Sequence, residues 1–226
     1  MVHSLRSHRI RFVAAALLVC GSVAIVSAAE PKGAVGGTLG LSARPAGASA
    51  GPYLGPGFGG TSLGSVIFVD ADLSPRISVG GEVSIAGDIT GLQDERVPAG
   101  STTLLSQHHD TVVSGVLKLK MPATNRFQIS AAGGLGLARR QTNRTGTFAS
   151  FSAPFVSTPV TENLSDTVLA VTGGLDGVFA INSRVGVLAL VRVHYLADND
   201  LVPDGVVHRG VSSLILRCGI GARVRF

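Results

Sequence analysis

The end of the chain alternates between two kinds of side chain with a period of two, which is typical of a β-strand. Between Ser212 and Phe226, one face carries no ionisable group apart from a cysteine, whereas the opposite face carries three arginines. The uncharged face consists of Ser212, Leu214, Leu216, Cys218, Ile220, Ala222, Val224 and Phe226. A strand of this kind needs an apolar environment on one side and a polar one on the other. This requirement constrains the fold more than any other feature of the sequence.

Five further segments sort their side chains in the same way, and none places a charge on its apolar face. They begin at Ile77, Thr111, Phe127, Leu169 and Val185. In the first of them, every odd position from Ile77 to Ile89 is expected on one face. We therefore predict strands from about ten to fifteen residues long, which is longer than the usual five or six.

Two weaker strands are predicted closer to the N-terminus, at Val35–Arg44 and about Gly59–Asp70. In the second, the alternation is blurred because Val66 and Phe68 fall on the face opposite Leu63. Its facing is therefore left open.

The connections between these strands alternate in length. Three are short, near 71–75, 122–125 and 182–183, and four are long, at 45–58, 90–107, 141–165 and 197–209. Short turns at one end and long loops at the other are typical of up-and-down barrels in the bacterial outer membrane. The sequence predicts an all-β fold: one closed antiparallel transmembrane barrel of about eight strands.

A soluble, secreted barrel of the lipocalin type also alternates, and it remains an alternative at this stage. Only 15% of the residues are charged, against about a quarter in a typical soluble domain. The polar faces of the strands are rich in Gly and Ser, which suit a crowded interior better than a solvated exterior. In lipid, only helices and closed barrels satisfy every backbone group. We therefore favour the membrane.

The first residues have the order of a secretory signal peptide: basic residues, an apolar run and small residues. Arg6, Arg9 and Arg11 precede the apolar run 12–20, and small residues follow at 27–29. We predict a cleaved signal at 1–29 and a barrel domain at 30–226. Cys20 leaves a lipoprotein signal as an alternative, although Val19 is larger than the residue usual before a lipidated cysteine.

Removal of this leader would leave Cys218 as the one cysteine and exclude an internal disulfide bond. It would also lower the formal net charge from +5 to about +2, because three arginines leave with it. No basic stripe with interleaved aromatic residues follows. Nucleic-acid binding is therefore not expected.

The ending Gly221-Ala222-Arg223-Val224-Arg225-Phe226 resembles the C-terminal assembly signal of outer-membrane proteins. Gly221 and Phe226 match that signal, whereas Val224 stands where an aromatic residue is commoner. With the leader and the meander, the chain resembles small eight-stranded barrels of the OmpA transmembrane-domain or OmpX type. The resemblance implies a monomer in the outer membrane, contacts with lipid and lipopolysaccharide, delivery by the barrel-assembly machinery, and no cofactor. The absence of Trp is a departure from it.

Charged side chains on the polar faces are expected to point into the barrel. An eight-stranded barrel has an interior just wide enough for side chains to fill. These residues form either a structural network of ion pairs or a narrow, anion-preferring pathway for small solutes. They are Glu82, Lys118, Asp176, Arg192, Arg217, Arg223 and Arg225.

Two other constellations invite chemical hypotheses. His108, His109 and Asp110, with His194 and His208 at a similar predicted height, raise the idea of a metal site. We expect instead solvated histidines at the rim, and predict no metal. A lipopolysaccharide-modifying enzyme would need a nucleophile beside a base, such as Ser101 or Ser106 beside His109. No third residue is evident to orient that pair, so we predict no enzyme.

The long segment 141–165 carries Phe148, Phe151 and Phe155 at nearly regular spacing. These rings are either a binding surface outside the cell or packing against the barrel rim. The sequence therefore predicts an integral outer-membrane barrel with a structural, surface-interaction or limited permeation role, and does not choose among these roles.

Overall fold

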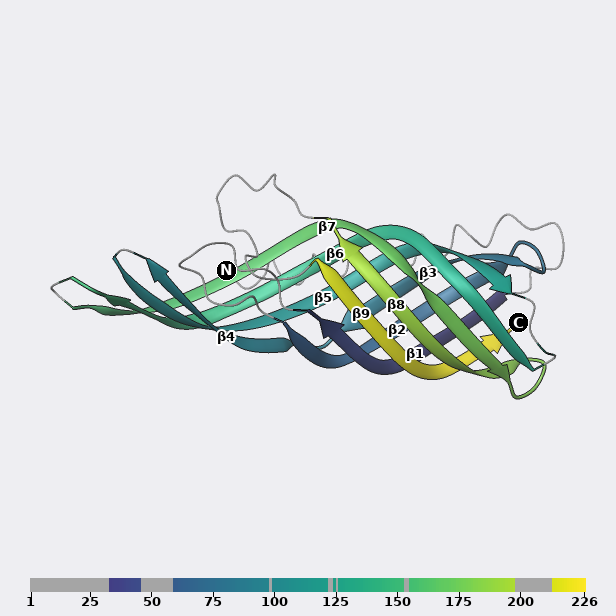
Figure 1. Ribbon diagram of the computed structural model, residues 1–226. Coiled ribbons are helices and arrows are strands. Elements are labelled where there is room, and N and C mark those ends of the chain that lie inside the picture. The colour runs from purple at the N-terminus through teal and green to yellow at the C-terminus, as the bar shows by residue number, and fades with distance from the viewer. Residues whose placement is uncertain are drawn as a thin grey trace, which may run out of the picture.

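The structure is a computed structural model that describes residues 33–45, 59–97, 99–121, 124, 126–152, 155–197 and 213–226. The predicted signal peptide lies outside these residues. Nine strands are labelled in Figure 1. They are β1 (Gly33–Arg44), β2 (Gly60–Asp72), β3 (Ile77–Ala86), β4 (Ile89–Val97), β5 (Gly100–Met121), β6 (Phe127–Ser150), β7 (Ser157–Ala180), β8 (Val185–Leu196) and β9 (Leu214–Arg225).

The strands close into a ring in which every neighbouring pair is antiparallel. The sheet runs β3-β2-β1-β9-β8-β7-β6-β5-β4, and an additional pairing of β3 with β5 closes it. Because β3 and β4 pair with successive parts of β5, they act as one strand. The predicted eight-stranded, up-and-down barrel is therefore confirmed.

A β-bulge separates β3 from β4. Ile85 pairs with Thr111, whereas Ile89 pairs with His108, so four steps along one strand oppose three along the other. The extra residue reverses the facing of everything that follows, as bulges do. Ile89 is consequently buried at 4% exposure, and the prediction that it shares the outward face of Ile77 is wrong.

The short connections lie together at one end of the barrel. Hydrogen bonds to side chains close two of these turns: Ile77 N–H donates to Ser74 Oγ at 3.0 Å and Val185 N–H donates to Asn182 Oδ1 at 2.7 Å. The backbones of Gly33 and Phe226 exchange two hydrogen bonds at this same end. In outer-membrane barrels this end faces the periplasm.

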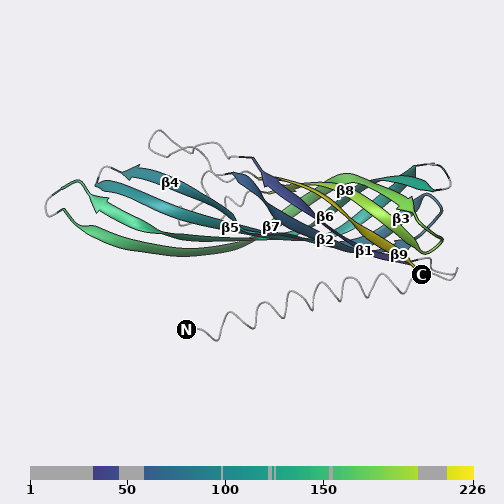
Figure 2. The same ribbon diagram turned by 90° about the horizontal axis from the view of Figure 1, so that it is seen from below.

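At the other end, β5, β6 and β7 run far beyond the barrel (Figure 2). The two predicted loops 90–107 and 141–165 are in fact paired strands, with β6 and β7 of 24 residues each. We call the projecting sheet the arm: β4 with residues 100–111 of β5, 139–150 of β6 and 157–167 of β7. At about 3.3 Å per residue, a twelve-residue strand segment of the arm is roughly 40 Å long.

Most large apolar side chains of the barrel wall point outward, and the ionic ones of the central strands point inward. Ile77, Leu117 and Leu216 expose 36, 48 and 41% of their surface, whereas Arg192 and Glu82 expose 0 and 2%. This is the reverse of a soluble barrel, so the lipocalin alternative is wrong. In the part of the chain that the structure describes, no helix has the length and apolarity required to cross a membrane.

The strand whose facing was left open has apolar residues on both sides. Val66 and Phe68 are buried in the interior, while Leu63 and Ile67 are 77 and 55% exposed. Its alternation was blurred because the interior of the barrel is partly apolar at this point.

The outward-facing residues of β5, β6 and β7 show where hydrocarbon ends. Five successive cross-strand rows, from Met121–Ile129–Gly177 to Val113–Leu137–Leu169, contain no charged or polar side chain. The next row is Thr111–Arg139–Thr167, and the rows beyond it are predominantly polar. The apolar rows span nine residues of β5, which matches the nine to eleven that a tilted strand needs to cross the bilayer core. The arm therefore lies outside the membrane.

Candidate functional site

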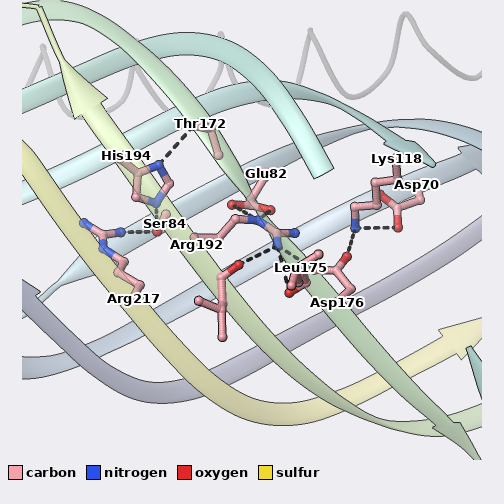
Figure 3. A network of polar contacts seen from close by, with 11 residues as sticks. Asp70, Glu82, Ser84, Lys118, Thr172, Leu175, Asp176, Arg192, His194 and Arg217 are labelled. Carbon is pink, nitrogen blue, oxygen red and sulfur yellow. Dashed lines mark hydrogen bonds and ion pairs between the residues drawn. The ribbon is translucent and has the colours of Figure 1, made fainter. Parts of the chain in front are cut away.

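The centre of the barrel is occupied by an ion-pair network (Figure 3). Arg192 on β8 donates from Nε to the two carboxylate oxygens of Glu82 on β3, at 2.9 and 3.2 Å. Its Nη1 lies 2.5 Å from Asp176 Oδ1 on β7. Because β3 and β8 are on opposite sides of the ring, this one guanidinium spans the interior.

Lys118 on β5 extends the network. Its Nζ lies 2.9 Å from Asp176 Oδ2 and 2.9 Å from Asp70 Oδ2, and 4.1 Å above the ring of Phe68. Asp176 therefore joins Lys118 to Arg192 (Figure 3). Each of these charges has an opposite charge beside it, which offsets the several kcal/mol that burial of an ion costs.

A second set of contacts surrounds Ser84, farther from the short turns. Ser84 Oγ lies 3.4 Å from His194 Nε2 and accepts a hydrogen bond from Arg217. The other ring nitrogen of His194 lies 3.0 Å from Thr172 Oγ1. This serine and histidine are near each other, but both are buried and the arginine contacts the hydroxyl group. The arrangement links β3, β8 and β9 and does not present a nucleophile to solvent.

His108 belongs to a third set, in which Asp110 Oδ2 lies 3.1 Å from Arg44 Nη1 and Asp110 Oδ1 lies 3.0 Å from His108 Nε2. His108 also contacts Arg44, and its Nδ1 lies 2.8 Å from Thr142 Oγ1. His108 and His194 are 1 and 0% exposed. The expectation of solvated rim histidines is therefore wrong for both, because their positions have inward parity.

Two further ion pairs lie within the arm. Arg140 makes a two-pronged contact with Asp166, with Nε and Nη2 reaching Oδ2 at 3.2 and 2.7 Å. Arg144 Nη1 lies 3.8 Å from Glu162 Oε2. Both pairs join β6 to β7.

Glycine provides space for the central guanidinium. Gly174 pairs directly with Arg192 across β7 and β8. A Cβ atom on Gly174 would overlap the Val191 carbonyl oxygen and lie 3.0 Å from Arg192 Cδ and Nη1. Any larger residue would therefore have to displace the Val191 backbone and crowd the arginine.

Two apolar clusters also lie in the described interior. Val66, Phe68, Leu188 and Leu190 form one, with Val178 packed against it. The other lies nearer the arm and consists of Val112, Ala138, Val168, Ala170, Leu196 and Ile215. Polar networks and apolar clusters together occupy the interior.

Not all the charges assigned to the interior lie in the central network. Glu82, Lys118, Asp176 and Arg192 come together, and Arg217 lies with the Ser84 set. Arg223 is 5% exposed, and its Nη2 is 4.0 Å from Asp70 Oδ2. Arg225 differs from the prediction: its side chain is 44% exposed at the short-turn mouth, where it bonds Asp72 at 3.1 Å.

The residues of the proposed assembly signal occupy the strand that closes the barrel. Val224 and Phe226 point outward with 43 and 71% exposure, and Gly221 packs against the backbone of Gly37. Recognition of this ending by an assembly machinery stays a prediction.

The aromatic residues of segment 141–165 lie at the far end of the arm. Phe148 is on β6 and is partly buried, whereas Phe151 and Phe155 are 55 and 79% exposed at the tip. The Phe151 amide donates to the Ala99 carbonyl at 3.0 Å and so ties two hairpin tips together. None of these rings packs on the barrel rim, because the arm carries them away from it.

The residues of the enzyme hypothesis do not meet. Ser106 is buried on the inward face, whereas His109 lies on the outward face with Nδ1 3.4 Å from Asp88 Oδ1. Ser101 shares the face of His109, but eight residues along a strand is about 26 Å. In the described ranges, no three His, Cys, Asp or Glu residues are grouped to hold a metal ion. His208 lies outside those ranges.

Sequence reasoning missed several members of the network: Asp70, Asp110, Arg44, His108 and His194. For Asp110 and His108 a signal existed, because both share the parity of Lys118 on β5. Asp70 was hidden by the mixed facing of β2. The pairing of Asp70 with Lys118 also depends on the β2–β3–β5 register, which residue types alone do not specify.

No family model matches the chain, and no curated protein matches it in sequence. Two solved structures are similar in fold. Ail, the attachment invasion locus protein of Yersinia pestis, solved with the heparin analogue sucrose octasulfate, is 16% identical with a TM-score of 0.50, over 88% of this chain and 100% of that one. A major outer membrane protein from Thermus thermophilus is 16% identical with a TM-score of 0.52, over 85% of this chain and 99% of that one.

The fold is that of a small bacterial outer-membrane β-barrel. The resemblance found in the sequence is thereby confirmed at the level of the fold. Together with the apolar rows on the outer surface, this fold places the chain in the outer membrane as an integral protein.

Proposed function

We propose that the barrel is a non-conducting anchor that presents the arm to a partner outside the cell. The observation that carries this proposal is the change in the outward rows of β5–β7 from apolar to polar, halfway along strands that continue without a break. The strands thus extend well past the bilayer. A protein that only needed to be anchored in the membrane could end near its surface, as β1, β8 and β9 do in the described structure.

The tip of the arm supports a contact role. Phe151, Phe155 and Val156 expose 55, 79 and 48% of their surface at the end of a sheet whose outer face is mainly polar, apart from Leu92 and Leu105. Exposed apolar groups surrounded by polar ones are typical of interaction sites. Backbone hydrogen bonds of Phe151 to Ala99 and of Ser150 to Val156 hold the backbone of the tip in place, which lowers the entropy cost of binding. Ail, which shares the fold, is named for attachment.

The interior argues against the permeation role. Arg192 and Arg217 are 0 and 2% exposed, and two apolar clusters lie in the same interior. An ion crossing this interior would have to break buried ion pairs, at several kcal/mol for each. The contact role also requires no catalysis, in keeping with the separation of Ser101, Ser106 and His109.

Adhesion of cells tests the proposal. Cells that display the full chain are compared with cells that display Phe151→Ser with Phe155→Ser, on surfaces coated with heparin, with dextran or with serum protein. We expect the double variant to adhere less to at least one coating. A matched control, Leu135→Ser, removes an equally exposed apolar residue from the barrel instead of the tip.

Equal adhesion of wild type and tip variant on every coating would contradict the contact role. Heat-modifiable gel mobility establishes that each variant is folded in the membrane. Loss of adhesion by Leu135→Ser alone would assign the effect to the barrel and not to the arm.

A further inference from the structure

The mouth of the barrel at the short-turn end contains a cavity of about 620 Å³. Six cationic side chains line it, and no carboxylate side chain does so among the described residues. The cations are Arg76, Lys120, Arg126, Arg184, Arg223 and Arg225. This volume is within the range of small-molecule sites.

Three of these arginines occupy the same position in three different turns. Arg76, Arg126 and Arg184 each immediately precede the first residue of a strand, namely β3, β6 and β8. Their carbonyl oxygens accept hydrogen bonds from Lys120, Ala180 and Arg225 of the neighbouring strands, at 2.8, 2.7 and 2.7 Å. The repeated geometry thus distributes an arginine to each of the three short turns around the mouth.

The cations of this cavity are not neutralised by their surroundings. Asp72 forms ion pairs with Lys120 at 2.5 Å and with Arg225 at 3.1 Å. Arg223 is 4.0 Å from Asp70, which is already paired with Lys118. Arg76, Arg126 and Arg184 form no ion pair with any described residue. In addition, the buried Nε of Arg223 lacks a hydrogen-bond partner among the described residues. The six cations of the cavity therefore have two carboxylates near them: Asp72, which Lys120 and Arg225 share, and Asp70, which Arg223 shares with Lys118.

The inner side of the cavity is lined by Lys120 and Arg223. Beyond Lys120 and Arg223 lie the Lys118–Asp70–Asp176 contacts and the apolar cluster around Phe68. Apolar side chains also border it: Met121, Phe127 and Ile181, all exposed on the outer side of the barrel. The cavity thus combines guanidinium donors with an apolar edge at the level where hydrocarbon ends.

We propose that this cavity binds a phosphate group at the periplasmic face of the membrane. Guanidinium forks match the oxygens of phosphate in pairs, and several of them from different turns can surround a single dianion. The phosphate belongs either to the headgroup of an inner-leaflet phospholipid or to a free, soluble phosphate. Basic pockets at this depth in membrane proteins hold lipid headgroups in the same way.

Two binding measurements separate the sources. Purified barrel in a maltoside detergent is titrated with sodium pyrophosphate, followed by NMR shifts of the turn amides. In parallel, the barrel is reconstituted in nanodiscs of phosphatidylcholine with phosphatidylglycerol. Native mass spectrometry then identifies by mass the lipids that stay bound after release from the nanodisc. The test variant is Arg76→Gln with Arg126→Gln and Arg184→Gln, whose side chains are exposed and outside the packed interior.

We expect the triple variant to bind roughly tenfold more weakly in at least one measurement, since three exposed charge pairs contribute modestly each. The same three positions changed to Lys should keep much of the binding, and Arg139→Gln, at the opposite membrane boundary, should keep all of it.

An effect on pyrophosphate binding assigns the site to a soluble phosphate, and an effect confined to phosphatidylglycerol assigns it to a lipid headgroup. Absence of binding by the wild type, or equal binding by wild type and triple variant in both measurements, overturns the proposal. Where the triple variant does not fold, Arg126→Gln alone gives the same comparison with a smaller change.

Discussion

Arg192 on β8 and Glu82 on β3 meet across the full width of the barrel, with Nε of the arginine 2.9 Å from Oε2 of the carboxylate. The two residues are 110 positions apart in the chain, and both are almost completely buried. Their contact ties opposite walls of the ring together. These buried contacts occupy the centre of the barrel and join β3 to β8 from within.

Removal of Arg192 alone should destabilise the folded barrel more than removal of both Arg192 and Glu82. Arg192→Leu leaves Glu82 and Asp176 without their shared cation, and breaking a buried pair typically costs about 3–5 kcal/mol. The double variant Arg192→Leu with Glu82→Leu should be more stable than Arg192→Leu alone, because it leaves one fewer unpaired charge. Denaturant-dependent unfolding in lipid vesicles measures the free energy of unfolding of the single and of the double variant.

Two adjacent glycines should respond differently to the same substitution. Gly174→Ala places a methyl group against Val191 and the Arg192 guanidinium, and such overpacking costs about 1–3 kcal/mol. Gly173→Ala is the matched control, because nothing lies within 4 Å of its Cβ position. It should be neutral or slightly stabilising. Equal destabilisation by the two changes in an unfolding titration would show that Gly174 does not make space for the arginine.

The sequence predicts the facing of most strands, because parity is a local property. Leu117 and Lys118 point in opposite directions as expected. The alternation puts Ile89 on the wrong face because the bulge at 87–88 adds a residue that no local pattern indicates. The sequence predicts a loop at Asn143 and Thr145 because the outer face becomes polar above the membrane and the alternation disappears. The partners inside the barrel depend on the register of distant strands, as the contact of Lys118 with β2 illustrates.

The packed interior should not conduct. Reconstituted in planar bilayers, the wild-type chain should give no steady open level at moderate voltage in potassium chloride, because Arg192, Asp176 and Lys118 occupy the axis. The comparison is with Arg192→Ala with Glu82→Ala, which empties part of the interior and should raise the frequency of brief openings. A stable, anion-selective level from the wild type would restore the permeation role.

An arginine should be tolerated on the arm and not on the barrel wall. Leu117 lies in the middle of the five apolar rows, and Leu117→Arg should cost about 2–4 kcal/mol. Gln107 faces outward on the same strand ten residues away, so Gln107→Arg is the matched control and should be close to neutral. Refolding into vesicles across a guanidinium series measures the difference. Similar costs at the two positions would place the membrane boundary elsewhere.

The central claim is that the outward flank of the barrel touches lipid and that the arm does not. Spin labels on Leu135→Cys and Thr145→Cys, in a Cys218→Ser background and in lipid vesicles, report contact with oxygen dissolved in hydrocarbon or with a water-soluble nickel complex. The two positions face outward on β6, one in the apolar rows and one in the polar rows. We predict that the label at 135 is relaxed mainly by oxygen and the label at 145 mainly by nickel. Relaxation of both labels mainly by nickel would contradict the assignment of a membrane-spanning barrel.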